Sequence, residues 1–140
     1  MSVTIELTGG EQLTDYLVEL PEKMMERVVR RSLYAGISKI QDEARKDAPV
    51  LAVAGQGPHY PGELRDNIRV STGRRGDVMR ARCGITPEAF YGRFLEFGTR
   101  HAPAYPFMRP AADAASGAAA QQVIDTATEN CRTELGTAAT

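Results

Sequence analysis

The chain has 140 residues, of which 42% are hydrophobic and 25% charged, and its formal net charge is −1. This length suits one domain, the apolar content is too high for a disordered chain, and no run reaches the roughly 20 apolar residues that span a bilayer. A net charge near zero argues against a globally basic nucleic-acid-binding protein. The charge is uneven, however: residues 65–109 hold nine arginines and four acidic residues, a net +5, whereas residues 1–64 and 110–140 each carry −3. Such polarity suits a molecule that meets different surfaces on different sides, copies of itself included.

The N-terminal third of the chain predicts a short strand followed by two helices. Residues 3–7 alternate between apolar and polar side chains, the pattern of a half-buried strand. A short helix is expected over residues 11–20 and a long one over residues 22–47, which ends because a residue before Pro49 is disfavoured in helical backbone. One apolar stripe follows the long helix and consists of Met25, Val29, Leu33, Ile37, Ile40 and Ala44.

Residues 64–71 and 78–85 predict an antiparallel hairpin with a turn over residues 72–77, after a loop over 50–63 whose conformation the sequence leaves open. One face of the hairpin is core-like and the other is basic. The arginines of the basic face are Arg65, Arg69, Arg80 and Arg82, with Arg74 and Arg75 at the tip. A guanidinium binds phosphate or carboxylate oxygens through a planar fork, so the face fits a DNA backbone or an acidic protein surface. A solvated strand face is the third interpretation.

The C-terminal third predicts two more helices. One starts at Thr86, as N-cap, and Pro87, and runs to Phe97, with Gly98 as a left-handed cap. All four phenylalanines lie between residues 90 and 107, so a packing centre is expected there. After an extended stretch over 100–106, a second helix is expected from residue 107, followed by a frayed tail over 136–140. Its small-residue stripe, which would let another backbone approach closely, consists of Ala120, Ile124, Ala127, Cys131 and Leu135.

Residue types that catalyse reactions or bind metals are sparse. His59 and His101 lie in separate Pro-rich loops, Cys83 falls on the core face of the hairpin, and neither Cys83 nor Cys131 has the spacing of a metal ligand. We therefore predict no metal, no cofactor and no enzymatic activity, and two reduced thiols. Glu96 lies between two apolar residues, and we expect either a buried acid or, in preference, a carboxylate that accepts hydrogen bonds from loop N–H groups.

Two sequence motifs resemble those of a known family. They are Tyr91-Gly-Arg-Phe-Leu-Glu96-Phe97-Gly98-Thr99 and Pro106-Phe107-Met-Arg-Pro110-Ala111, preceded in the family's order by a helix ending in Ala48-Pro49 and by Gly62-Glu-Leu64-Arg-Asp-Asn-Ile68. In these motifs the chain is similar to the tail-completion and head–tail joining proteins of tailed bacteriophages, akin to the minor tail protein Z of phage lambda. It departs from the family at Pro61, where a threonine is common, and in the length of the 50–60 loop.

The resemblance implies a non-catalytic α+β domain that acts as a ring subunit in the virion neck or tail end. We expect a single domain over residues 1–135, in which an antiparallel sheet, with strands near 3–7, 64–71 and 78–85, packs against the helix over 22–47 and the C-terminal helix. Copies are expected to form a closed head-to-tail ring, six-fold, that joins the tail to the DNA-filled head after assembly in the cytoplasm of the bacterial host. Its partners would be other neck and tail proteins, not a membrane.

Two sets of site residues follow from this interpretation. Phe94, Phe97 and Phe107 would anchor the loop over 98–106, so that it presents a docking surface to a neighbour. The expected interface consists of Tyr91, Phe94, Glu96, Phe97, Gly98, Thr99, Pro106, Phe107 and Pro110. The residues expected to face packaged double-stranded DNA or an acidic partner are Arg65, Arg69, Arg74, Arg75, Arg80 and Arg82. The alternatives are a small DNA-backbone-binding module that uses the hairpin over 65–85 and, last, a hydrolase that uses Glu96 or His101.

Overall fold

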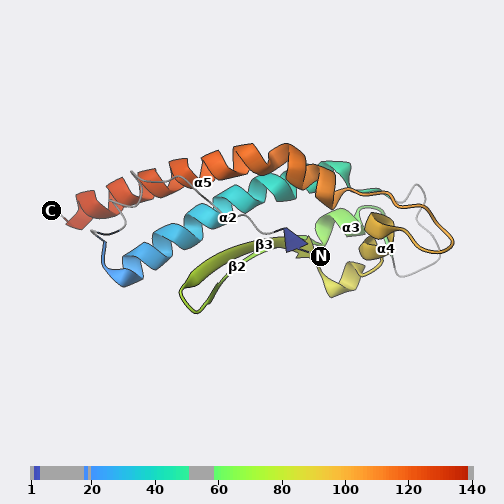
Figure 1. Ribbon diagram of the computed structural model, residues 1–140, viewed down its shortest axis with the longest axis horizontal. Coiled ribbons are helices and arrows are strands. Elements are labelled where there is room, and N and C mark those ends of the chain that lie inside the picture. The colour runs from blue at the N-terminus through green and yellow to red at the C-terminus, as the bar shows by residue number, and fades with distance from the viewer. Residues whose placement is uncertain (1, 4–17, 19, 51–58, 139–140) are drawn as a thin grey trace.

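The fold is α+β, as predicted, and has three layers. A computed structural model describes residues 2–3, 18, 20–50 and 59–138 of the chain (Figure 1). A three-stranded antiparallel sheet in the order β1-β3-β2 forms one layer, α2 the middle layer and α5 the other outer layer. The elements in chain order are β1 (Ser2–Val3), α2 (Glu22–Asp47), α3 (Glu63–Asp66), β2 (Ile68–Arg75), β3 (Val78–Ile85), η1 (Pro87–Ala89), α4 (Gly92–Phe97) and α5 (Met108–Ala138). The predicted sheet and its two long helices are confirmed, but α5 packs chiefly on α2 and not on the sheet itself.

The middle layer, α2, has the predicted bounds. Its acidic first turn and basic last turn complement the helix dipole, and Ala48 takes an extended conformation before Pro49. Ile37 and Ile40 are fully buried, and burial of each such side chain stabilises the fold by about 1.5–3 kcal/mol. The buried side of the helix is wider than the predicted stripe because two of its faces are covered, one by the sheet and one by α5. Val28, Ser32 and Gly36 are therefore buried as well.

The outer helix α5 lies along α2 for much of its length (Figure 1). Its buried side repeats every four residues, at Ala111, Ala115, Ala119, Val123, Ala127 and Cys131. The predicted stripe was therefore wrong by one residue in its first half, at Ala120 and Ile124, and right at Ala127 and Cys131. Close approach between the helices is extreme at Gly36, where an added Cβ would lie 2.3 Å from Cγ2 of Val123. The helix continues past Leu135 to Ala138, into the segment expected to fray.

The sheet differs from the prediction at its edges. The predicted strand over 64–71 begins only at Ile68, because Gly62 adopts φ +91° and starts the helical turn α3. The start of β2 is fixed from α2, since Gln41 and Arg45 both donate hydrogen bonds to the carbonyl oxygen of Ile68. The strands pair as far as Arg75 with Val78, so the turn is shorter than expected. Of the strand predicted over 3–7, β1 includes Val3, and residues 4–7, like most of the helix expected over 11–20 and of the loop over 50–63, lie outside the described residues.

The predicted helix from Thr86 to Phe97 is two short pieces. The 3-10 turn η1 ends at Ala89, and α4 begins at Gly92. Thr86 precedes the first piece but forms no capping hydrogen bond; its hydroxyl donates to Oδ1 of Asn67 instead. None of the helices in the described ranges is long and apolar enough to cross a membrane.

Candidate functional site

Glu96 anchors the N-terminus of α5 from inside the protein. Its carboxylate is fully buried and accepts hydrogen bonds from the backbone N–H groups of Phe107 (2.8 Å), Met108 (3.0 Å) and Arg109 (3.2 Å), and from Nε of Arg109 (3.2 Å). The first N–H groups of a helix lack intrahelical partners, so this carboxylate acts as the cap of α5. Burial raises the pKa of Glu96, but these hydrogen bonds outweigh it and hold the pKa below its ordinary value. The preferred prediction for Glu96 is confirmed.

The loop between α4 and α5 has a fixed path. Gly98 adopts φ +73° and ψ 174°, a combination that is essentially restricted to glycine. The positive φ predicted there is confirmed, but ψ lies outside the left-handed helical region. Beyond it, Thr99 pairs with Ala102, and the N–H of Tyr105 donates to the carbonyl oxygen of Leu95 at 2.7 Å. The loop is therefore closed on itself near its start and bonded to α4 near its end.

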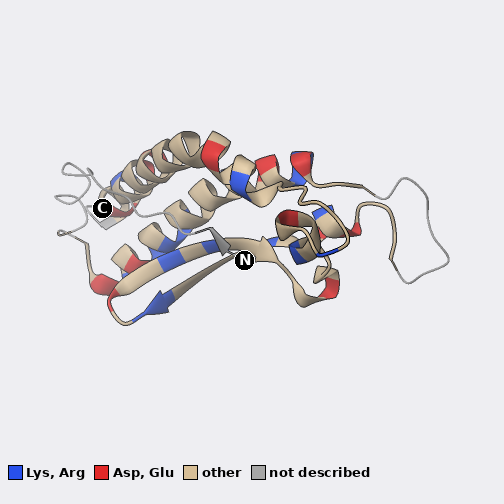
Figure 2. Ribbon diagram, turned by 45° about the vertical axis from the view of Figure 1, so that its right-hand side comes forward, with Lys and Arg blue, Asp and Glu red and all other residues tan. Residues whose placement is uncertain are grey.

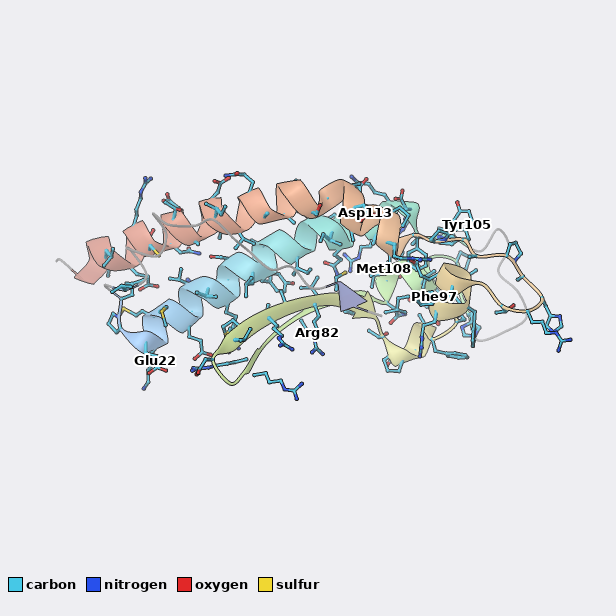
Figure 3. All side chains as sticks on the ribbon, in the orientation of Figure 1. Glu22, Arg82, Phe97, Tyr105, Met108 and Asp113 are labelled. Carbon is cyan, nitrogen blue, oxygen red and sulfur yellow. The ribbon has the colours of Figure 1, made fainter. Side chains whose placement is uncertain are left out.

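Aromatic side chains just before α4, on α4 and on the loop after it are exposed to solvent. Phe90, Phe94, Phe97 and Tyr105 are 57%, 54%, 55% and 60% exposed, and we call these four the aromatic surface. The rings of Phe90 and Phe94 meet edge to face, with centroids 6.1 Å apart, and the Arg109 guanidinium lies 5.3 Å from the centroid of Phe97. Figure 3 shows Phe97 and Tyr105 at the end of the molecule where α4 and the loop lie.

The predicted packing centre was therefore wrong for three of the four phenylalanines. Only Phe107 is buried, so Phe94 and Phe97 do not anchor the loop from inside. The inner side of this segment is formed instead by Gly92, where an added Cβ would lie 2.6 Å from Cδ1 of Leu64, and by Leu95, which packs against the core.

The structure distributes the other expected interface residues between the interior and the surface. Glu96 and Phe107 are buried, so they position the aromatic surface and are not part of it. Thr99, Pro106 and Pro110 are exposed. The expected interface is thus a surface layer supported by a buried one.

A partly buried hydrogen-bond network that sequence reasoning missed lies at the N-terminal end of α4. The carboxylate of Glu63 is bound by the Tyr91 hydroxyl at 2.9 Å and by Nδ1 of His59 at 2.6 Å. The rings of His59 and Tyr91 also meet edge to face, with centroids 5.0 Å apart. Burial, and next the hydrogen bond to Glu63, raise the pKa of Tyr91 to about 12. His59 and Glu63 are four residues apart in a stretch that was predicted as loop, whereas Tyr91 lies 28 residues from Glu63, so no local motif marks the network.

The structure separates the six arginines of the predicted basic face. By the strand register, Arg69, Arg75, Arg80 and Arg82 share the sheet face opposite to that of the buried Ile68, Ala81 and Cys83, and we call these four the arginine face. Arg74 lies on the opposite sheet face, 3.6 Å from both Glu22 and Glu26 of α2. Arg65 belongs to α3, where its Nε donates to the carbonyl oxygen of Arg45. A shallow hollow lined in part by Arg75, Arg80 and Arg82 lies on the arginine face.

The residues considered for catalysis lie apart from one another. Cys83 and Cys131 are free thiols in the interior, and burial raises the pKa of Cys83 to about 11. His101 is exposed in the loop, whereas His59 contacts Glu63. No group of three or more His, Cys, Asp or Glu side chains able to hold a metal ion occurs in the described part of the chain. What the described residues do offer is surface for macromolecular contact, aromatic at one end and basic on the sheet.

Comparison with protein-family models matches residues 11–98 to one family, whose description is "Bacteriophage HK97-gp10, putative tail-component". The match covers more than half of the chain and ends at Gly98, after α4. No curated protein and no solved structure matches the chain. The likeness to the lambda minor tail protein therefore rests on the sequence motifs alone.

Proposed function

The chain belongs to the HK97-gp10-like family of bacteriophage tail components, and on that premise we propose that it is a ring-forming subunit of the virion neck or tail end, which joins the tail to the DNA-filled head. Membership of the family makes the protein a structural component of the virion that meets other tail proteins. The ring, its six-fold symmetry and the joining of head to tail are the proposal.

The aromatic surface is the observation that carries the proposal. Aromatic residues supply much of the binding energy of protein interfaces, and Phe94 and Phe97 expose more than half of their area to water. Their support is rigid because Glu96 caps α5 and the loop is bonded to α4, so little conformational entropy is lost on docking. The surface lies at one end of an elongated molecule (Figure 1), which suits contact with an adjoining neck or tail protein stacked along the particle axis.

Electron microscopy of phage particles tests the joining role. Particles made without this protein should show separate heads and tails, and supply of the wild-type chain should join them. The double variant Phe94→Ser, Phe97→Ser should fold, as judged by circular dichroism, and should leave heads and tails separate. Tyr34→Ser, which changes an aromatic residue exposed on α2, is the matched control and should join them. Joined particles in the absence of the protein would refute the proposal.

A second candidate function, binding of a DNA backbone, is favoured by the arginine face. Four guanidinium groups lie on one side of the hairpin. Such a group of positive charges binds the phosphates of a DNA backbone, including packaged double-stranded DNA in a ring lumen. This function predicts affinity for duplex DNA that falls steeply with salt, with roughly one counterion released per arginine that contacts phosphate. Loss of that affinity in Arg80→Ala with Arg82→Ala would support it, and an unchanged affinity would exclude it.

A further inference from the structure

The four arginines of the arginine face form a single row. The register of the hairpin sets Arg69 opposite Gly84, Arg82 opposite Ser71 and Arg80 opposite Gly73, and Arg75 continues the row near the turn. Each arginine among the first three thus faces a small residue across the strands, so no two like charges are directly opposite. From Arg69 to Arg75 the row extends about 20 Å, at about 3.4 Å per residue.

The arginines of the arginine face form no ion pair within the described residues, although Arg69 interacts electrostatically with Glu88. The ion pairs of the described arginines involve Arg27, Arg30, Arg74 and Arg109. Arg69, Arg75 and Arg82 are exposed, and Arg80 is half-buried. A row of four unpaired guanidinium groups repels itself, and an opposing row of carboxylates would relieve that repulsion.

The matching carboxylates lie on the outer layer at the other side of the molecule. Asp113, Asp125 and Glu129 each follow a buried residue of α5 by two positions, about 200° around the helix, so they point away from α2. All three are exposed and form no ion pair with the described residues; the Asp125 carboxylate accepts one hydrogen bond, from Nε2 of Gln121 at 2.8 Å. We call them the acidic row; Gly117 and Gln121 fill the helical positions between them. The row is about 24 Å long, at about 1.5 Å per residue.

Figures 2 and 3 show the two rows on opposite sides of the layered molecule. In Figure 3, Arg82 lies below the hairpin, whereas Asp113 lies on α5 beyond α2. In Figure 2 the blue segments of the hairpin and the red segments of α5 are likewise separated by α2. Opposite charges on opposite faces cannot pair within one copy, but they pair between successive copies stacked in the same sense.

We propose that the arginine face of one copy docks on the acidic row of α5 in the next copy, which makes the heterologous contact of the ring. This inference rests on the ring of the proposed function and adds which surfaces close it. Rows of similar length and opposite sign favour this contact, and heterologous contacts of one kind are what a closed ring requires. A DNA backbone would pair with the arginines but would leave the acidic row without a partner, whereas a second copy satisfies both rows.

Charge reversal tests the contact. We expect the wild-type chain to self-associate in sedimentation experiments, more weakly as the salt rises. Arg80→Glu with Arg82→Glu should weaken association by roughly 100-fold or more, and so should Asp125→Arg with Glu129→Arg, because each puts like charges opposite each other. The control is Arg31→Glu with Lys39→Glu, an equal charge change at exposed residues of α2, which should associate like the wild type.

A mixture of the two reversed variants provides the decisive arm. The acidic hairpin of one variant then meets the basic α5 of the other, which is the natural pair with both signs reversed. The other contact, between the unchanged basic hairpin and the unchanged acidic α5, is the wild-type pair, so association should return only in the mixture. Association of either variant alone at wild-type strength would overturn the inference while the ring stands. A wild-type chain that stays monomeric at low salt would overturn the ring itself. A third outcome is that the wild type binds duplex DNA, loses this binding when Arg80 and Arg82 are changed, and does not self-associate. That outcome would assign the arginine face to DNA and overturn the inference.

Discussion

The buried carboxylate of Glu96 positions the aromatic surface although Glu96 is not itself exposed there. Its carboxylate accepts four hydrogen bonds from the start of α5 and the Arg109 side chain. Of its neighbours, Leu95 packs against the core and Phe97 is exposed to solvent. Glu96→Gln replaces a charged acceptor by a neutral amide whose NH₂ cannot accept, and we expect a loss of about 2–4 kcal/mol in the free energy of unfolding. Urea unfolding measures it. Glu129→Gln, on exposed α5, is the control and should change that free energy by less than about 0.5 kcal/mol.

The lowered pKa of Glu96 predicts how acid affects stability. In the folded state this pKa lies below the ordinary value of 4.5, so the carboxylate contributes stability above pH 4.5 that is lost as the pH falls through the folded pKa. Wild-type unfolding free energy should therefore drop between neutral and acidic pH more than that of Glu96→Gln. Parallel pH profiles for the two chains would contradict the role of Glu96 as the charged cap.

Gly98 is a second single residue on which the aromatic surface depends. An added Cβ would lie 2.8 Å from the backbone nitrogen of Ala104 and 3.1 Å from the carbonyl oxygen of Ala102, at a backbone conformation that strains any other residue. Gly98→Ala should cost about 1–3 kcal/mol in unfolding free energy, measured by thermal or urea unfolding. Gly73→Ala is the matched control because a Cβ there meets nothing within 4 Å and φ is not positive.

At the scale of elements, α2 and α5 pack so closely that a side chain larger than that of glycine does not fit between them at Gly36. A Cβ at Gly36 would lie 2.8 Å from the carbonyl oxygen of Ala119 as well as against Val123, so backbone as well as side chain must move. Gly36→Ala should destabilise the fold by about 1–3 kcal/mol although alanine is the better helix former. Gly117→Ala, on the open side of α5, should instead stabilise by up to about 1 kcal/mol. Equal effects of the two substitutions on urea midpoints would disprove this close packing.

The same elements show what the sequence can and cannot predict. The bounds of α2 follow from its large apolar residues at helical spacing and from Pro49, which are local signals. The buried side of α5 was misjudged because alanine suits a buried or an exposed position equally. A helix rich in alanine therefore does not reveal from its sequence which of its sides is buried. The strand start was placed too early because the sequence does not reveal that Gly62 takes positive φ and starts a helical turn.

The candidate site was predictable in its motifs but not in its geometry. Glu96 was assigned its correct role and Gly98 its positive φ because both lie where one predicted helix ends and a short segment leads to the next, and the partners of Glu96 are only 11 to 13 residues away. The phenylalanines were placed in the core because hydrophobicity is the same signal for a core and for an interface. Glu63 was missed because its partner Tyr91 is 28 residues away and its nearer partner His59 lies in a stretch where no helix was predicted.

At the scale of the whole molecule, three kinds of surface occupy three directions. The aromatic surface lies at one end of the long axis, and the arginine face and the acidic row lie on the two outer layers (Figures 1 and 2). In a ring built from contacts between outer layers, the ends of the subunits stay outside the sibling contacts. Contacts to siblings and contacts to adjoining virion proteins are thereby assigned to different residues.

This separation predicts that the two kinds of contact can be lost independently. Phe94→Ser with Phe97→Ser should keep wild-type self-association in sedimentation and lose the joining of heads to tails in electron microscopy. Arg80→Glu with Arg82→Glu should lose self-association, while a pull-down of adjoining tail proteins from infected-cell extract should still recover the partners that the wild type recovers. All four side chains are wholly or partly exposed, so neither pair should change the unfolding free energy by more than about 1 kcal/mol. If the serine variants abolish self-association as well, the aromatic surface contacts siblings, and the assignment of directions is wrong.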